Sequence, residues 1–382
     1  MVDEHVERLI AELRPKCPAI VESPWLEAAV RAVPRHLFIE RYAEGVNSND
    51  PWAPVDWVTV DRKRPLPEAL QRIYSDQGLM MRSPPDHSAA SQPALVVTML
   101  HELGLEPGMK VLEIGTGSGW NAGLIAHGVS HDGLVHSVDI QHDLVEQARE
   151  HLSAAGHPGV RLRSGDGGAG WPEAASFDRI IATVGCPDIP PAWLDQLTDG
   201  GVLLVPLLMR GFWAPPLRLQ KRGTTFVGAF RGHSGFMTLQ GAHHTDAHDR
   251  LIIDDLPTGL PVRSVSLPEG MTFRFLWFLF VTNGAFRYAG RRTEETPLIL
   301  HHVNSGSWIS FMPDDPKLEL RGRTRAFDDL RSAQEEWVGC GRPSLKSFEV
   351  DVVAADEPPD GGWLDTRRSL TLRYRLPASA GS

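Results

Sequence analysis

Residues 111–120 read Val-Leu-Glu-Ile-Gly-Thr-Gly-Ser-Gly-Trp, and they carry the strongest indication of the fold class. A short, mainly apolar run leads into a turn with glycine at positions 115, 117 and 119, and the next apolar run ends on Asp139. A glycine-rich turn between a strand and a helix presents backbone N–H groups at the carboxyl edge of a parallel sheet. The stretch therefore predicts a ligand site at the edge of an α/β sheet.

Strands and helices alternate on both sides of this stretch, between residues 92 and 207. The strands are short, continuous apolar runs, and amphipathic segments separate them. This pattern is typical of a parallel sheet that helices cover on both faces, so we expect a Rossmann-like, doubly wound α/β domain. The expected elements are helix 92–103, strand 110–114, helix 119–128, strand 134–138, helix 142–155, strands 160–163 and 178–184, helix 190–197 and strand 201–207.

The residues before this core predict helices followed by irregular structure. Helical periodicity covers residues 3–15, and Ser23-Pro24 is a favourable start for a second helix that runs to about residue 33. Residues 44–90 are rich in Pro, Asp, Asn and Ser, which indicates irregular structure over the front of the domain. We therefore expect a first domain over 1–241, made of helices and loop at 1–90 and the core at 91–241.

A second, smaller domain is expected after the polar segment 241–250. Before this segment, residues 217–223 and 225–230 have the pattern of a hairpin that closes the edge of the sheet. After it, residues 251–382 hold short β-like runs among Pro and Gly, and Phe275–Val281 is expected to be a buried strand. The sequence therefore predicts a β-rich or α+β accessory domain over 251–382.

Composition argues against several classes of protein. The chain has 382 residues, 42% of them hydrophobic, and its formal net charge of -10 disfavours nucleic acid as a partner. Three widely spaced cysteines form neither a disulfide framework nor a metal-binding pattern. The N-terminus lacks a secretory pattern, and the most apolar segment is far shorter than the roughly 20 residues that span a bilayer. We expect a cytoplasmic protein without a membrane partner.

The spacing of the glycines favours S-adenosylmethionine as the ligand. G-x-G-x-G after an acidic residue differs from the G-x-G-x-x-G turn of NAD-binding sites, and S-adenosylmethionine has no pyrophosphate to bind. We expect the amino acid part of the cofactor to pass over Gly115, Gly117 and Gly119. An NAD site is the alternative.

Acidic side chains complete the predicted cofactor site, because carboxylates accept hydrogen bonds from hydroxyl and amino groups. Asp139 is expected to accept from both ribose hydroxyls. Asp166, in Ser164-Gly-Asp-Gly-Gly168, is expected to accept from the adenine amino group. Glu113 either contacts the cofactor through the loop or holds the loop by hydrogen bonds, and we favour the second role.

Two strings, Val33-Pro-Arg-His-Leu-Phe38 and Ser91-Gln92-Pro93, stand before the glycine turn, and Gly165-Asp166-Gly167 follows it. In this order they resemble the protein-L-isoaspartate O-methyltransferase family, over roughly residues 24–241. The resemblance implies methyl transfer from S-adenosylmethionine to an aspartate or isoaspartate carboxylate of a protein or peptide, with S-adenosylhomocysteine as product. It also implies that Ser91 is the catalytic residue beside that carboxylate, with Ser88 and Gln92 binding substrate. Ser91 is equally a natural N-cap for the helix beginning at Pro93.

The chain departs from the family pattern at two points. Ala89 stands where repair enzymes of the family carry a threonine, and residues 251–382 follow the catalytic domain. In both respects the chain resembles the peptide-tailoring members that modify ribosomally made peptides, including lanthipeptides. That resemblance implies methylation of an aspartate side chain, which leads to a succinimide (aspartimide) and then isoaspartate. The alternatives are a general isoaspartate repair enzyme and a non-catalytic module that binds cofactor or peptide.

Other reactive side chains are given structural roles. The polar segment contains His243, His244, Asp246, His248 and Asp249, but a solvated loop is the preferred interpretation, so no metal site is predicted. Cys186 has no paired base in the sequence pattern and is expected to be a small buried side chain.

Overall fold

The computed structural model describes most of the chain, and contacts divide it into two compact units. The first unit comprises Met1–Val184, Pro190–Val205 and Leu239–Ala242, and the second comprises Gly185–Ile189, Pro206–Thr238 and His243–Ser382. The described residues are 2–45, 55–83, 86–232, 234–243, 256–266, 268, 270–290, 297–312, 315, 317–353 and 362–377.

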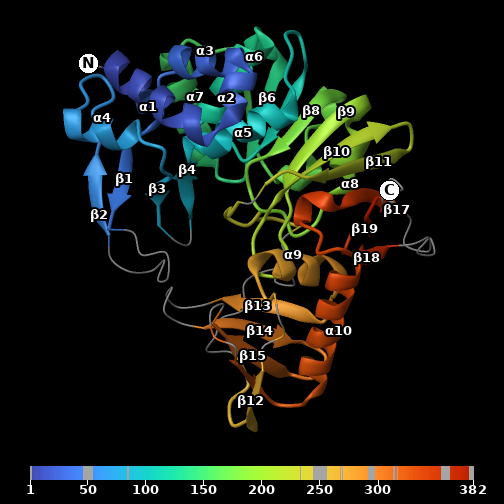
Figure 1. Cartoon of the computed structure of the whole chain (residues 1–382). Helices are drawn as coiled ribbons and strands as arrows, with labels where there is room; N and C mark the ends of the chain where they lie inside the picture. The colour runs from blue at the N-terminus through green and yellow to red at the C-terminus, as the bar shows by residue number, and fades with distance from the viewer. Residues whose placement is uncertain are drawn as a thin grey trace. The chain divides into compact units, whose positions relative to one another are not determined.

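Five parallel strands form the centre of the first unit (Figure 1). Their order is β7-β6-β5-β8-β9, so the chain reverses direction across the sheet between β5 and β8. A ligand of a doubly wound sheet binds at such a reversal, beyond the carboxyl ends of the strands. The predicted Rossmann-like sheet is confirmed. The strands are β5 (Val111–Ile114), β6 (Val135–Asp139), β7 (Arg161–Ser164), β8 (Phe177–Ala182) and β9 (Leu197–Pro206).

The helices of the first unit lie close to their predicted positions. Helices at the N-terminus pack against those of the core, and a Cβ at Gly128 would lie 2.7 Å from the Trp25 ring. That close approach explains a glycine inside a helix. The helices are α1 (Val2–Lys16), α2 (Pro18–Glu22), α3 (Pro24–Ala32), α5 (Pro93–Leu103), α6 (Trp120–Val129), α7 (His142–Ala154) and α8 (Pro191–Asp195).

The segment before the core is more regular than its composition predicts. Strands β1 (Arg41–Glu44) and β2 (Asp56–Thr59) form one antiparallel pair. Helix α4 (Pro67–Ile73) follows, and β3 (Leu79–Arg82) pairs with β4 (Ser88–Ala90). The expectation of irregular structure throughout 44–90 was therefore wrong, because tertiary pairing of short strands overrides their weak local pattern.

The second unit contains an antiparallel sheet in the order β10-β11-β17-β19-β18. The hairpin predicted at 217–230 is present as its first two strands. Residues from near the C-terminus supply the other three. One division between the units lies inside the polar segment, between Ala242 and His243, and the second unit also takes in residues 185–189 and 206–238. The strands are β10 (Pro216–Arg222), β11 (Thr225–Phe230), β17 (Glu349–Val353), β18 (Trp363–Thr366) and β19 (Thr371–Arg375).

A second antiparallel sheet in this unit has the order β12-β16-β15-β14-β13. Helix α10 (Arg325–Gly339) packs against α9 (Phe273–Thr282) and against β15. The α+β character of the C-terminal region agrees with the prediction. The strands are β12 (Val262–Ser266), β13 (Phe286–Gly290), β14 (Leu298–His302), β15 (Ser307–Phe311) and β16 (Lys317–Arg321).

The predicted strand at Phe275–Val281 is wrong, because these residues form most of helix α9. Every side chain from 275 to 281 is buried, and Phe278 contacts the rings of Phe348 and Trp363. A helix that is buried on all sides shows no apolar period, so its sequence cannot be told from that of a buried strand. Within the described parts of the chain, no helix is long and apolar enough to cross a bilayer.

Candidate active site

The glycine turn joins β5 to α6 at the reversal of the sheet. Gly115, Gly117 and Gly119 all have positive φ, at +98°, +50° and +90°. A Cβ at Gly119 would lie 3.2 Å from that of Ala148, whereas a Cβ at Gly117 would meet nothing within 4 Å. The middle of the turn therefore faces open space, which leaves room for a ligand directly over its backbone.

Asp139 closes this turn from the end of β6. Its Oδ2 accepts a hydrogen bond of 2.9 Å from the Gly117 N–H, and its Oδ1 accepts one of 3.0 Å from the Gln141 N–H. Burial raises the pKa of Asp139, and these backbone donors oppose the rise. Each carboxylate oxygen keeps a further lone pair, so the side chain can also accept from hydroxyl groups of a ligand.

Asp166 lies after β7, at the start of a short 3-10 helix, Gly167–Ala169. Its Oδ1 accepts from the Gly168 N–H and its Oδ2 from the Ala242 N–H, both at 2.8 Å. A Cβ at Gly241 would lie 2.7 Å from Asp166, so a glycine is needed there. No feature of the sequence pattern indicates that residues 241 and 242 lie against this aspartate.

Glu113 is completely buried beneath the turn. Its carboxylate accepts from Asn121 Nδ2 at 2.7 Å and from Ser137 Oγ at 2.5 Å, and burial raises its pKa to about 7. These contacts join the end of β5 to α6 and β6. The sequence favours a loop-holding role for Glu113, and these hydrogen bonds are compatible with that role.

The three residues predicted to position or bind the substrate occupy different environments. Ser91 is partly exposed, and among the described residues its hydroxyl has no hydrogen-bond partner. The N-cap position of α5 belongs to Gln92, so the Ser91 hydroxyl does not cap this helix. Gln92 donates through Nε2 to the Asp76 carboxylate at 3.1 Å. Ser88 is only 3% exposed, inside the β3–β4 pair, so its side chain is shielded from solvent.

Arg35, whose place after the second helix in the sequence indicates an anchor for the N-terminal segment, also contacts the residues around Ser91. Its guanidinium is fully buried and donates to the Ser91 carbonyl at 2.9 Å. It also lies over the Trp120 ring, 5.3 Å from the centroid, and Trp120 is the first residue of α6. Arg35 therefore joins the backbone of Ser91 to the helix that begins at the glycine turn. The string Val33–Phe38 was the available signal.

A second connection runs from Asp139 to the β3–β4 hairpin. The Gln141 backbone N–H binds Asp139, while its side-chain Nε2 donates to the His87 carbonyl at 3.3 Å. Arg82 donates to Gln141 Oε1 at 3.2 Å. The hairpin that leads to Ser91 is thus fixed to the glycine turn near both of its ends.

Thr183, just after β8, packs against Gly115 at the start of the glycine turn. Its Oγ1 donates to the Gly115 carbonyl at 2.6 Å, and a Cβ at Gly115 would lie 2.5 Å from this oxygen. The residues that follow include Cys186, whose thiol is fully buried; burial raises its pKa well above the ordinary value. A thiol of this kind is not a nucleophile near neutral pH.

The histidine-rich segment lies mostly outside the described residues, since His244, Asp246, His248 and Asp249 are not among them. In the described ranges, no group of three or more His, Cys, Asp or Glu side chains is placed to hold a metal ion.

The residues present suit S-adenosylmethionine. The space over Gly117 is open, and Asp139 supplies acceptors beside it, at the end of the neighbouring strand. Asp166, just after β7, supplies a further hydrogen-bond acceptor. Such acceptors suit hydroxyl and amino donors of an adenosine group.

Comparison with known proteins leads to the same cofactor. Residues 35–239 match the family described as protein-L-isoaspartate(D-aspartate) O-methyltransferase. A protein-L-isoaspartate O-methyltransferase from Pyrococcus horikoshii is 36% identical over 231 residues, which cover 60% of this chain and 90% of that protein. The enzyme of the same name from Thermotoga maritima is 33% identical over 292 residues, 74% of this chain and 85% of that protein.

A solved protein-L-isoaspartate O-methyltransferase structure shares the fold of almost the whole chain. The TM-score is 0.57 at 21% identity, and the match covers 98% of this chain and all of the other. The protein is a methyltransferase that uses S-adenosylmethionine and acts on carboxyl groups. Because the family match spans more than half of the sequence, this chain belongs to the protein-L-isoaspartate(D-aspartate) O-methyltransferase family.

Proposed function

We propose that this enzyme methylates the free carboxylate of isoaspartyl residues in proteins or peptides. The family match and two relatives above 30% identity support this substrate class. The observation that carries the proposal is the position of Arg35, which joins Ser91 to the first residue after the glycine turn. An acceptor carboxylate beside Ser91 would then lie on the same rigid assembly as the cofactor turn.

The reaction needs positioning rather than a general base. A carboxylate has an ordinary pKa of about 4, so it is already ionised at neutral pH. The Ser91 hydroxyl can donate to the carboxylate oxygen that does not react, which fixes the orientation of the other oxygen. Arg35 keeps the Ser91 backbone in place, and Asp139 keeps the turn in place.

When bound, S-adenosylmethionine supplies a sulfonium methyl group, which passes to a carboxylate oxygen as the sulfur leaves with the bonding electron pair. The product ester is a better electrophile than the carboxylate. The next backbone nitrogen of the substrate can therefore attack it, lose its proton and expel methanol, which closes a succinimide. Water then opens the ring to aspartate or isoaspartate.

A second candidate is methylation of an ordinary aspartate side chain in a ribosomally made, modified peptide. Ala89 favours it, because this position, on β4 and two residues before Ser91, has no hydroxyl to offer a substrate. The length of the chain does not favour it, since the Thermotoga maritima relative aligns over 74% of this chain. Isoaspartate therefore remains the first proposal.

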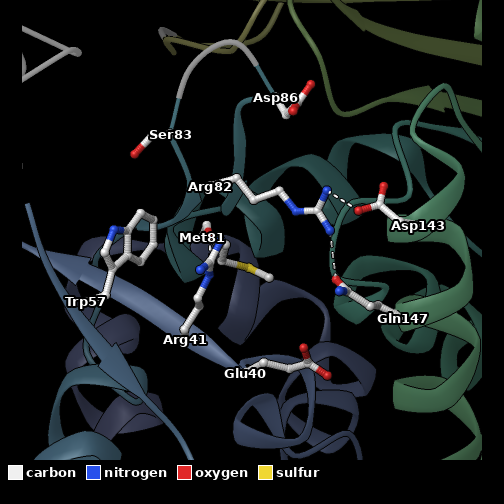
Figure 2. Close-up of a pocket in the computed structure, with 9 residues that line it drawn as sticks. All are labelled: Glu40, Arg41, Trp57, Met81, Arg82, Ser83, Asp86, Asp143 and Gln147. Atoms are coloured by element: carbon white, nitrogen blue, oxygen red, sulfur yellow. Dashed lines mark hydrogen bonds and ion pairs between the residues drawn. The ribbon is translucent and has the colours of Figure 1, made fainter.

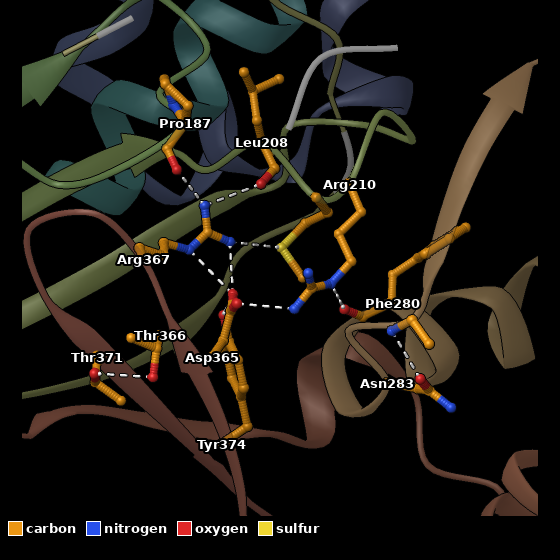
Figure 3. Close-up of polar contacts among 12 residues, drawn as sticks. Pro187, Leu208, Arg210, Phe280, Asn283, Asp365, Thr366, Arg367, Thr371 and Tyr374 are labelled. Atoms are coloured by element: carbon orange, nitrogen blue, oxygen red, sulfur yellow. Dashed lines mark hydrogen bonds and ion pairs between the residues drawn. The ribbon is translucent and has the colours of Figure 1, made fainter. Parts of the chain in front are cut away.

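The C-terminal strands hold residues 185–189, a segment of the same unit that follows β8. Arg367, after β18, donates to the Pro187 carbonyl at 2.6 Å (Figure 3). The Ser369 N–H donates to Asp188 Oδ2 at 2.6 Å. Pro187 and Asp188 follow Thr183 within a few residues of chain. These contacts fix the path of residues 185–189 within the second unit.

Three synthetic peptides that differ at one position test the proposal. Each is acetylated and amidated, and the central residue is isoaspartate, aspartate or asparagine. After incubation with the cofactor, mass spectrometry should show a methyl group gained by the isoaspartyl peptide alone. Methyl gain or loss of water in the aspartyl peptide alone would favour the tailoring function. Cofactor binding by calorimetry without reaction of any peptide would indicate a non-catalytic module.

A further inference from the structure

A cavity of about 630 Å³ lies in the first unit, beside the β3–β4 hairpin (Figure 2). Its walls come from β1, β2, β3 and the N-terminal half of α7. The volume is in the range of small-molecule and peptide subsites, about 300–1,000 Å³. None of the residues that take part in the proposed methyl transfer lines it, so the cavity has no role in the reaction as described above.

Most charges around this cavity are already matched. The Arg82 guanidinium lies 2.6 Å from the Asp143 carboxylate and donates to Gln147 Oε1 at 3.1 Å. Glu40 faces two partners, with its Oε1 at 3.3 Å from His151 and at 3.4 Å from Arg62. These groups hold the walls together and leave little capacity for a ligand.

Arg41 is different. Its guanidinium stacks over the Trp57 ring, 4.5 Å from the centroid, and its Nε donates to the Met81 carbonyl at 3.3 Å. Within the described part of the chain, its two terminal nitrogens have no hydrogen bond or ion pair. Stacking uses the face of a guanidinium and leaves the N–H groups at its edge available. A held guanidinium with a free edge is suited to bind a carboxylate through two parallel hydrogen bonds.

The β3–β4 hairpin connects the wall of the cavity to Ser91. Arg82, on the cavity wall, pairs in register with Ser88, and Ser91 follows three residues later. Extended chain advances about 3.3 Å per residue, so the cavity lies on the order of 10 Å from Ser91 along the hairpin. A substrate peptide that runs beside the hairpin would cover this distance with about three residues.

We infer that Arg41 and Trp57 form a subsite for a second carboxylate of the substrate, about three or four residues from the methylated one. This inference rests on the proposed function, because it takes Ser91 as the position of the methyl-accepting group. The ligand is an acidic side chain of the same peptide. The α-carboxylate of a peptide that ends at this distance has the same chemistry and is separated in the test.

The test uses isoaspartyl peptides that are acetylated and amidated and carry a single glutamate three or four residues before or after the isoaspartate. Matched peptides carry glutamine instead, and a third set ends at that position with a free carboxylate. The measurements are peptide affinity by fluorescence anisotropy and KM of methylation, on the wild type, Arg41→Gln and the control Arg149→Gln. Arg149 is an exposed arginine of α7, paired with Glu146, and its replacement changes the net charge equally.

For one direction along the peptide, we expect the glutamate peptide to bind the wild type about tenfold more tightly than its glutamine partner. Arg41→Gln should abolish this difference, and Arg149→Gln should retain it. Tighter binding of the free-carboxylate set alone, with no difference between the glutamate and glutamine peptides, would identify the α-carboxylate as the ligand and overturn the side-chain assignment. Equal affinity of glutamate and glutamine peptides in every register, with methylation of both, would overturn the inference and leave the proposed function intact. Methylation of none would overturn both.

Discussion

The guanidinium of Arg35 donates a hydrogen bond of 2.9 Å to the carbonyl oxygen of Ser91. Arg35 has no carboxylate partner in the described structure. Its two Nη groups also donate to other backbone carbonyls, including that of Ile73 at 2.6 Å and that of Gln77 at 3.1 Å. Burial lowers the pKa of Arg35 to about 10, which still leaves the side chain charged at neutral pH. The buried Arg35 guanidinium therefore holds the backbone of residues 73–77 together with that of Ser91.

Arg35→Lys should destabilise the protein and reduce turnover together. An ammonium group cannot reach the same set of carbonyls, and each buried acceptor left without a donor costs about 1–3 kcal/mol. We expect a loss of about 2–4 kcal/mol in the free energy of unfolding, measured by urea denaturation. The control Arg31→Lys, on the exposed face of α3, should change it by less than about 1 kcal/mol. Equal stability of the Arg35 variant and the wild type would contradict the role given to this residue.

Ser91→Ala should lower kcat while the affinity for the cofactor is retained. The Ser91 hydroxyl has no partner in the described structure, so its removal breaks no internal bond. Loss of one positioning hydrogen bond to a charged group should reduce kcat about tenfold or more. The measurements are initial rates on the isoaspartyl peptide and calorimetry with S-adenosylhomocysteine. Ser153→Ala, on the exposed surface of α7, is the matched control. An unchanged kcat would remove Ser91 from the reaction.

Asp139→Ala, in contrast, should weaken the binding of the cofactor. The Asp139 carboxylate holds the Gly117 N–H and offers acceptors beside the open space of the turn. We expect the affinity for S-adenosylhomocysteine to fall about 10- to 100-fold, because hydrogen bonds to a charged group are lost. Asp195→Ala, an exposed aspartate at the end of α8, should bind normally. Normal binding by the Asp139 variant, measured by calorimetry, would show that the cofactor lies elsewhere.

These variants also mark what could be predicted from the sequence. The glycine turn and Asp139 were predictable because the turn, the strand ends and their spacing are local features that parallel-sheet geometry brings together. The contacts Arg35–Ser91 and Asp166–Ala242 join residues 56 and 76 positions apart, and no periodicity records such pairs. The helical state of Phe275–Val281 was hidden for another reason, since complete burial erases the apolar period.

The cavity beside the hairpin was equally beyond prediction. Its walls come from segments whose composition indicates irregular structure, and only the pairing of β1 with β2 brings Trp57 to Arg41. Exposed aromatic and cationic side chains on short strands have no distinctive spacing. Their function depends on tertiary pairing, which the local sequence does not encode.

Glu113→Gln should change how stability depends on pH. The pKa of Glu113 is about 7 in the folded protein and close to 4.5 in the unfolded chain, so the folded protein holds the proton more tightly. This group therefore stabilises the fold fully below about pH 4.5, and the stabilisation is lost as the pH rises through about 7. The variant lacks this loss, so relative to the wild type it should gain on the order of 2–3 kcal/mol between pH 4.5 and pH 8. Urea denaturation at both pH values measures the difference, and a constant difference would contradict the raised pKa.

Arg367→Met should destabilise the second unit, because it leaves the buried Asp365 carboxylate without one of its two arginine partners. Arg367 is completely buried and donates to Asp365 Oδ2 through Nε and Nη2, at 3.0 and 2.9 Å (Figure 3). Without it, Asp365 keeps the Arg210 guanidinium at 2.8 Å and the Tyr374 hydroxyl at 3.2 Å. Removing one partner of a buried ion pair costs about 3–5 kcal/mol, and the remaining partners should hold the loss near the lower end.

Two further variants separate the charge effect from a packing effect. Arg368→Met, at the exposed neighbouring position, should lower the midpoint of thermal unfolding only slightly. Adding Asp365→Leu to Arg367→Met removes the uncompensated charge and should recover part of the lost stability, because an apolar replacement of a buried pair avoids its desolvation. If the double variant were less stable than Arg367→Met alone, the carboxylate would not be the source of the instability. The carbonyls of Pro187 and Leu208, to which Arg367 also donates, would then account for the loss.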